Sequence, residues 1–172
     1  MSISAAGLDF IRSYETLQLK PYNDGYGNWT IGYGHKITAE EAAAMSEGID
    51  QATADAMLAE DIAWIEAGVN NNFDGELTQN EFDALVSLGF NIGRSALVNS
   101  DIFDYAEVTD PSYFTKPYDK KAYEAAVLQK FRQYINSGET YSLGLDRRRV
   151  DEAEMFLYGD YSRDNDLTCD PL

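Results

Sequence analysis

Apolar residues recur at helical spacing along most of the chain, but the pattern changes near its beginning. Residues 4–16 carry an apolar stripe of helical period, and Ser4 is a candidate N-cap. From 21 to 38, glycines alternate with aromatic and β-branched residues, which predicts short strands joined by tight turns. We therefore expect a helix followed by a small antiparallel sheet.

Helical patterns dominate the remainder. Thr38–Glu41 and Thr78–Glu81 both have the Thr-x-x-Glu arrangement of a capping box, in which the two end residues satisfy each other's backbone N–H groups. Between them, a long helix is expected to start at Asp50 or Thr53 and to run through Val69.

Later in the chain, helices are expected near 120–136 and 147–157. The segment 100–119 contains prolines and turn-forming residues, which predicts a long loop with one helical turn. The tail at 161–172 is polar and acidic, and we expect it to be frayed.

The order of these elements predicts an α+β, mostly helical fold. We expect one domain over 1–160, with a sheet-bearing lobe at about 12–50 and a helical lobe at about 70–160.

The charge of the chain is strongly negative. Thirty acidic residues oppose thirteen basic ones, for a formal net charge of −17. Such a charge repels nucleic acid and anionic membrane surfaces, so neither is an expected partner. We also expect no membrane-spanning helix, no secretory signal at the start and, because Cys169 is the single cysteine, no internal disulfide.

Two carboxylates and a hydroxyl stand out near the predicted sheet. Glu15 falls where the first helix should end, Asp24 in the glycine-rich segment and Thr30 on the next strand. Hydrolysis of a glycosidic bond commonly uses one group that donates a proton and another that activates water or attacks directly. Spacing alone does not separate such a pair from ordinary solvated surface carboxylates.

The residues around these positions are more specific. A Glu is followed by eight residues, an Asp, five residues and a Thr that opens a T-x-G-x-G-H run at 30–35. A central segment at 77–93 and a G-L-x-x-R-R-x-x-E run at 144–152 follow in order. Together these motifs resemble the phage-type lysozymes, glycoside hydrolase family 24, over residues 8–159.

The resemblance implies a lysozyme-like two-lobe fold and an endo-acting muramidase. Such an enzyme would hydrolyse the β-1,4 bond between N-acetylmuramic acid and N-acetylglucosamine in bacterial peptidoglycan, by inversion. Glu15 would be the general acid, and Asp24 would activate a water with help from the Thr30 hydroxyl. Tyr33 and Gly34 would bind substrate or support the site.

The resemblance also assigns roles outside the sheet. Asn91 would bind an N-acetyl or hydroxyl group of the sugar, although an ordinary turn asparagine is an open alternative. Arg148 would be the partner of Glu15, with its neighbours Arg147 and Arg149 as alternatives.

The one histidine, His35, would form a structural ion pair with Asp61 and take no part in the chemistry.

A calcium loop is a second interpretation of one segment. The residues from Asn70 to Glu81 overlay an EF-hand loop, with oxygen-bearing side chains at its first, third and fifth positions, Gly75 at the sixth and Glu81 at the twelfth. The first position is normally Asp, however, and turns favour the same residue types. We expect no required cofactor and leave Ca²⁺ and an ordinary turn as alternatives.

Other functions on the same fold stay open. The chain could be a non-catalytic peptidoglycan-binding or scaffolding module. An active enzyme could be a phage endolysin, a tail-associated enzyme or an injected antibacterial effector, the last with an immunity protein as partner. In each case we expect a monomer that is made in the cytoplasm and reaches peptidoglycan in the periplasm or cell wall after holin release or injection.

Overall fold

The structure, a computed structural model, describes all residues except 24, 26, 74, 107–116 and 166–172. It divides into two compact units. Unit 1 comprises Met1–Phe10 and Ile65–Leu172, and unit 2 comprises Ile11–Trp64. Each unit is therefore described by itself. The first ten residues belong with the later helices, a placement that the lobes expected from the sequence left open.

Unit 2 contains a three-stranded antiparallel sheet in the order β1-β2-β3. Its elements are the end of α1 (Ala5–Tyr14), β1 (Gln18–Asn23), β2 (Trp29–Gly32), β3 (His35–Ile37), α2 (Ala39–Ala44) and the first part of α3 (Gln51–Asn72). The turn from β2 to β3 needs Gly32 and Gly34, whose φ angles of +67° and +99° favour glycine. The predicted sheet is thus present.

Local capping signals set where the helices of unit 2 begin. Thr38 and Glu41 form both bonds of the predicted capping box at the start of α2. Asp50, rather than Thr53, caps α3, because its Oδ1 accepts from the Thr53 N–H at 2.8 Å. Among the described residues of this unit, the buried apolar ones are Ile11, Ile31, Ala42, Ala54, Leu58 and Ile62.

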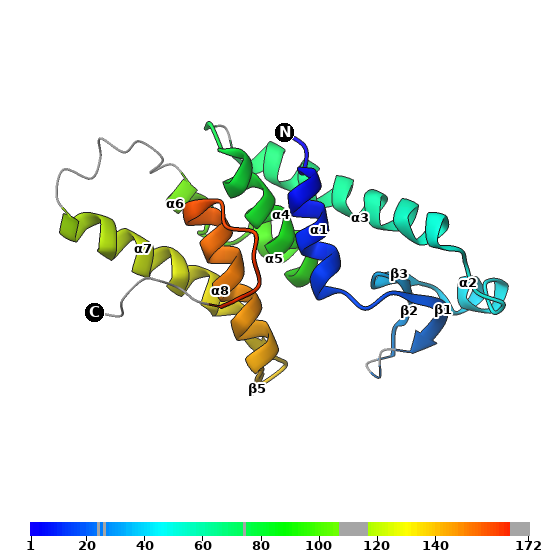
Figure 1. Cartoon of the computed structure of the whole chain (residues 1–172). Helices are drawn as coiled ribbons and strands as arrows, with labels where there is room; N and C mark the ends of the chain where they lie inside the picture. Colours follow the sequence, from blue (N-terminus) through cyan, green and yellow to red (C-terminus); the bar gives the residue numbers. More distant parts are fainter. Residues whose placement is uncertain (24, 26, 74, 107–116, 166–172) are drawn as a thin grey trace. The chain divides into compact units, whose positions relative to one another are not determined.

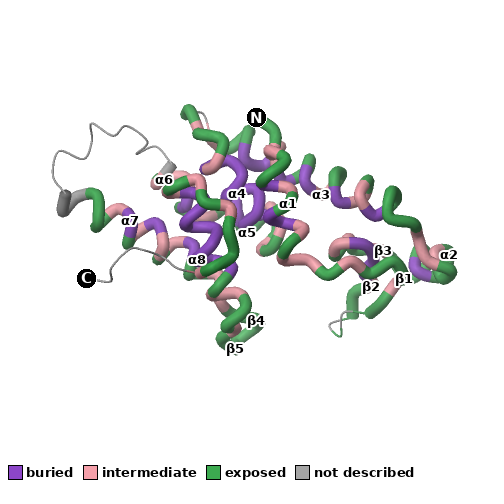
Figure 2. Tube along the Cα trace, viewed as in Figure 1, coloured by how far each residue is buried: buried purple, intermediate pink, exposed green. Residues whose placement is uncertain are grey.

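Unit 1 is built around α4, which is buried from Glu81 to Gly89 (Figure 2). Its other elements are α5 (Arg94–Val98), α6 (Phe103–Ala106), α7 (Pro117–Phe131), the 3₁₀ helix η2 (Arg132–Tyr134), β4 (Asn136–Ser137), β5 (Thr140–Tyr141) and α8 (Leu143–Tyr158). The N-terminal capping box of α4 is present at Thr78. In Figure 1, α8 and α4 lie side by side, and α7 packs on α8.

Close packing in unit 1 depends on small and aromatic residues. A Cβ added at Gly89 would lie 2.6 Å from side-chain carbons of both Ile65 and Leu97, so only glycine lets α4 approach them this closely. The Phe131 and Phe156 rings meet edge to face, with centroids 5.8 Å apart, and join α7 to α8.

Two sequence expectations are corrected in unit 1. The helix expected to reach residue 136 ends at Phe131, and a 3₁₀ turn and the β4–β5 hairpin follow. Gly138, with φ +62°, provides the hairpin turn. The tail does not fray at its start, because the Tyr161 hydroxyl donates to Asp83 at 2.8 Å and the Asn165 N–H to Asp151 at 3.0 Å.

The fold class is confirmed as mostly helical with a small antiparallel sheet. Within the described residues, no helix combines the length and the apolar character needed to cross a membrane.

Candidate active site

Glu15 is the first residue after α1. Its backbone N–H donates to the Arg12 carbonyl at 3.3 Å, which closes the last helical turn, and its side chain is half-buried. The candidate acid is therefore held by the helix end, where the sequence placed it.

Thr30 occupies the central strand of the sheet. It is only 5% exposed and lies between Tyr22 on β1 and Lys36 on β3. Because neighbouring strands hold its backbone on both sides, the position of Thr30 is fixed by the sheet.

Asp24 lies outside the described residues. On either side of it, Asn23 ends β1 and pairs with Trp29, and the Asn23 Oδ1 accepts from the Gly25 N–H at 3.0 Å. This bond spans two residues and is typical of a turn. The role of Asp24 stays a prediction from the sequence.

A set of polar contacts links the helix end that carries Glu15 to the turn that follows β2. The Gln51 side chain donates to the Tyr33 hydroxyl at 2.8 Å and to Asp55 Oδ1 at 3.1 Å. Arg12 pairs with the same Asp55 oxygen at 3.1 Å, and its guanidinium lies 6.0 Å from the centre of the Tyr33 ring. Since the backbone carbonyl of Arg12 also accepts from the Glu15 N–H, these contacts link the acid-bearing segment to this turn.

Gly34 and His35 follow Tyr33 in the same turn. A Cβ at Gly34 would meet no atom within 4 Å, so glycine is favoured there by its φ of +99° rather than by crowding. His35 Nδ1 lies 2.9 and 3.0 Å from the two carboxylate oxygens of Asp61. The structure thus brings the predicted pair together and connects β3 to α3; its non-catalytic role stays a prediction.

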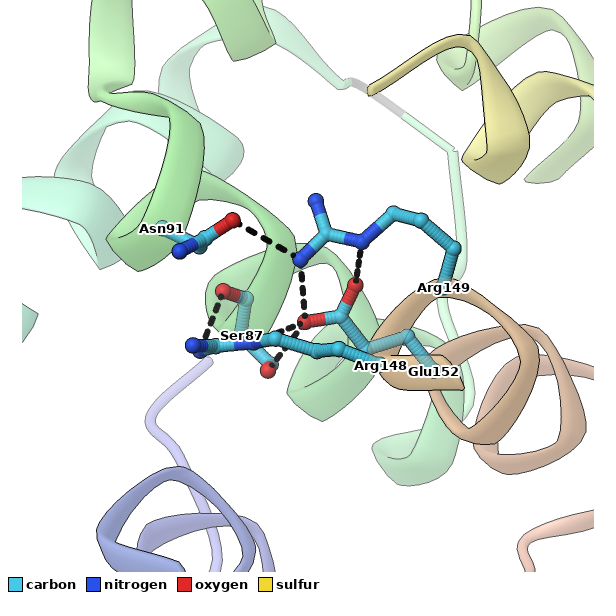
Figure 3. A network of polar contacts seen from close by, with 5 residues as sticks. All are labelled: Ser87, Asn91, Arg148, Arg149 and Glu152. Atoms are coloured by element: carbon cyan, nitrogen blue, oxygen red, sulfur yellow. Dashed lines mark hydrogen bonds and ion pairs between the residues drawn. The ribbon is translucent and has the colours of Figure 1, made fainter. Parts of the chain in front are cut away.

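A buried ionic network in unit 1 occupies the G-L-x-x-R-R-x-x-E motif (Figure 3). Glu152 is fully buried on α8; its Oε1 lies 3.0 Å from Arg148 Nε and its Oε2 lies 2.9 Å from Arg149 Nε. The Ser87 hydroxyl on α4 donates to Glu152 Oε1 at 2.7 Å. Because a buried carboxylate is costly unless paired and hydrogen-bonded, these contacts make the α4–α8 packing specific.

The network reaches the surface at Asn91. Arg149 Nη2 donates to the Asn91 Oδ1 at 3.0 Å, and Asn91 itself is exposed near the end of α4 (Figure 3). Arg149, not Arg148, therefore holds this candidate sugar-binding side chain. The expected partnership of Arg148 with Glu15 would join unit 1 to unit 2 and stays a prediction.

Two possible ligands of the EF-hand-like segment, Asn70 and Glu81, have partners within the protein. Asn70 and Asn72 lie in the last turn of α3, where Asn70 Oδ1 accepts from the Met1 ammonium at 2.7 Å. Glu81 accepts from the Thr78 N–H at 2.7 Å within the capping box. Asp74 lies outside the described residues. Both interpretations, Ca²⁺ and an ordinary turn, stay predictions.

Sequence reasoning missed the residues that support the site. Arg12, Gln51 and Asp55 were not singled out, although Gln51 and Asp55 have the i, i+4 spacing at which helical side chains meet. Ser87 gave no signal, because its partner lies 65 residues away in the sequence.

Comparison with known proteins shows which family the chain belongs to. The family described as phage lysozyme matches residues 12–152. An endolysin from Acyrthosiphon pisum secondary endosymbiont phage 1 is 36% identical over 156 residues, which cover 91% of this chain and 98% of that protein. The solved structure of an endolysin from Escherichia coli O157:H7 phage FAHEc1 is 30% identical, with a TM-score of 0.75 and coverage of 94% and 97%.

A second solved structure, the muramidase domain of SpmX from Asticaccaulis excentricus, is 32% identical with a TM-score of 0.70, and covers 91% of this chain and 97% of that one. The family match contains Glu15, Asp24 and Thr30 as well as the buried network of α8. From these similarities and the fold, the chain belongs to the phage lysozyme family and is a lysozyme-type hydrolase.

Proposed function

We propose that this lysozyme hydrolyses the β-1,4 bond between N-acetylmuramic acid and N-acetylglucosamine in peptidoglycan, and that it inverts the anomeric carbon in a single displacement. The observation that carries the proposal is the spacing of Glu15, Asp24 and Thr30 within the family match. The location of Glu15 at the end of α1 and of Thr30 in β2 supports it.

The proposed reaction needs one proton donor and one proton acceptor. Glu15 gives its proton to the glycosidic oxygen as the bond from that oxygen to the anomeric carbon breaks. A water held by the Thr30 hydroxyl attacks the opposite face of the sugar and passes a proton to Asp24. The carboxyl of Glu15 must carry its proton when substrate binds, while that of Asp24 must be ionised.

The supporting residues have proposed roles that follow from their contacts. Arg149 occupies the Asn91 oxygen, so the Asn91 amide nitrogen remains as a donor for a sugar oxygen. Tyr33 and Gly34 shape the turn after β2, and Arg148 positions Glu15. No cofactor takes part in these steps.

The product identifies the bond that is cut. Digestion of purified peptidoglycan should release reducing-end N-acetylmuramic acid, which borohydride converts to a muramitol derivative. Glu15→Gln should lower the rate by about a thousandfold or more, since it removes the proton donor. Glu40→Gln, which changes an exposed carboxylate on α2, is the matched control and should leave the rate unchanged. Equal rates for the two variants would favour the non-catalytic binding module.

The stereochemistry is tested separately. Inversion of a β-linked substrate gives the α-anomer first, and NMR recorded during the first minutes of digestion would detect it. The β-anomer as first product would contradict inversion without affecting the bond assignment.

Calcium has its own test. Because Asn70 and Glu81 already have partners, millimolar Ca²⁺ should not change the melting temperature of chelator-treated protein. A clear rise in melting temperature, lost in Glu81→Gln, would support an EF-hand site instead.

The relatives named endolysins favour a role in cell-wall lysis by a phage over injection as an effector. We infer that the enzyme acts as a monomer and needs no immunity partner. Expression in a bacterial host should then cause lysis once the inner membrane is permeabilised. Copurification with a tightly bound host-encoded inhibitor would favour the effector instead.

A further inference from the structure

An exposed surface at the start of α8 has no role in the proposed chemistry. It consists of Tyr141, Leu143, Arg132, Asp146 and Arg147, and we call it the Tyr141 surface. Tyr141 and Leu143 are each 54% exposed. Figure 2 shows the β4–β5 hairpin coloured as exposed at this end of α8.

The Tyr141 ring is exposed but held in place. Its hydroxyl donates to Asp146 Oδ2 at 2.9 Å. Arg132 donates to both oxygens of the same carboxylate, at 2.6 and 2.9 Å. The backbone of Tyr141 pairs with Asn136 across the hairpin. Because the ring is ordered in advance, a flat partner could stack on it at little cost in side-chain entropy.

The surface is also locally basic. Its charged residues are two arginines, Arg132 and Arg147, and one carboxylate, Asp146, in a protein of net charge −17. Arg148 and Arg149 are buried, whereas Arg147 is exposed. Among the residues that the structure describes, Arg147 forms no ion pair, so its charge is available to an anion.

We propose that the Tyr141 surface binds the peptidoglycan strand, an inference that rests on the proposed function. A sugar ring packs its C–H face on the electron-rich face of Tyr141, and a carboxylate of the same strand pairs with Arg147. Peptidoglycan carries both groups close together, since its stem peptides are attached to muramic acid. The surface thereby gives a strongly acidic enzyme a local attraction to an anionic polymer.

The test measures binding without hydrolysis. In the Glu15→Gln background, sedimentation with purified peptidoglycan should show about fivefold weaker binding for Tyr141→Ala and about threefold weaker binding for Arg147→Gln. Tyr158→Ala is the matched control, because Tyr158 is 45% exposed on the same helix. It should bind like the parent protein.

Two further measurements separate the contribution of the Tyr141 ring from that of the Arg147 charge. Tyr141→Phe keeps the ring but loses its anchor, so its binding should fall between those of the parent and Tyr141→Ala. On peptidoglycan whose carboxylates have been amidated, Arg147→Gln and the parent should bind equally. Parent-like binding of native peptidoglycan by either Tyr141→Ala or Arg147→Gln would overturn the proposal. Failure of the proposed function would show instead as absent muramitol from wild-type digests.

Discussion

A Cβ added to Gly7 would lie 2.7 Å from the Cγ of Asp83, closer than such carbons can approach. Asp83 is fully buried on α4, and it accepts hydrogen bonds from the Ser4 N–H at 3.0 Å, Gln79 at 2.8 Å and Tyr161 at 2.8 Å. Because these donors hold the carboxylate, it cannot withdraw from an added methyl group. Gly7 is therefore required by contact and not by its backbone conformation.

Gly7→Ala should destabilise the protein. Alanine is favoured over glycine in a helix by about 1 kcal/mol, but the clash with Asp83 should exceed this gain and lower the free energy of unfolding by about 2 kcal/mol. Gly144→Ala is the control, since the nearest atom to its added Cβ is Ser142 Oγ at 3.8 Å. Urea unfolding of both variants checks the prediction, and a Gly7→Ala protein as stable as Gly144→Ala would contradict it.

Asp61→Asn should affect stability and leave the chemistry intact. Both partners of the His35–Asp61 pair are partly exposed, with side-chain exposures of 26% and 35%, so loss of the pair should lower the free energy of unfolding by about 1 kcal/mol at most. Lytic activity well below the melting temperature should stay within about twofold of wild type. A large fall in kcat without a change in melting temperature would assign His35 to catalysis.

The stability contributed by Asp146 should depend on pH. Hydrogen bonds from Arg132 above all, and also from Tyr141, lower the pKa of Asp146 from its ordinary value of 3.8. A depressed folded pKa stabilises the protein above the ordinary value, and this contribution is lost as pH falls through the folded pKa. Asp146→Asn should therefore be less stable by about 1–2 kcal/mol at pH 7. Thermal unfolding from pH 7 down to pH 2 should show that gap closing below about pH 4; a gap of constant size would refute the assignment.

Salt should raise the activity at low ionic strength. The net charge of −17 repels the anionic wall, and screening shortens this repulsion to about 10 Å at 0.1 M salt. The initial rate of turbidity loss should rise as salt increases from about 0.01 to 0.1 M. A rate that falls from the lowest salt upward would show that the local charge of the Tyr141 surface outweighs the net charge.

Local signals made much of the fold predictable. The capping boxes at Thr38 and Thr78 contain both partners within four residues, and the glycine-rich strands have a pattern of their own. The β4–β5 hairpin was missed because each strand has only two residues and follows a helical stripe without a break. The order of the tail was missed because the partner of Tyr161 lies 78 residues away.

The sequence predicted which residues belong to the candidate site, but it did not predict which contacts they make. The motif identified Glu15 and Thr30, but no spacing indicates that Arg12 links the first of them to Tyr33. A sequence pattern that assigns charged residues to the surface also fails to predict a buried carboxylate such as Asp83. Such contacts depend on packing between distant segments, which a local pattern does not contain.

The connectivity of the two units sets an order in which they can be completed during translation. Unit 2 is one continuous stretch, so its sheet can form as soon as that stretch has left the ribosome. Unit 1 must wait, because Tyr161 is made 78 residues after its partner Asp83. A ribosome-bound nascent chain should therefore acquire protease resistance first in the sheet. At that stage Met1–Phe10 has not yet packed against the later helices of unit 1.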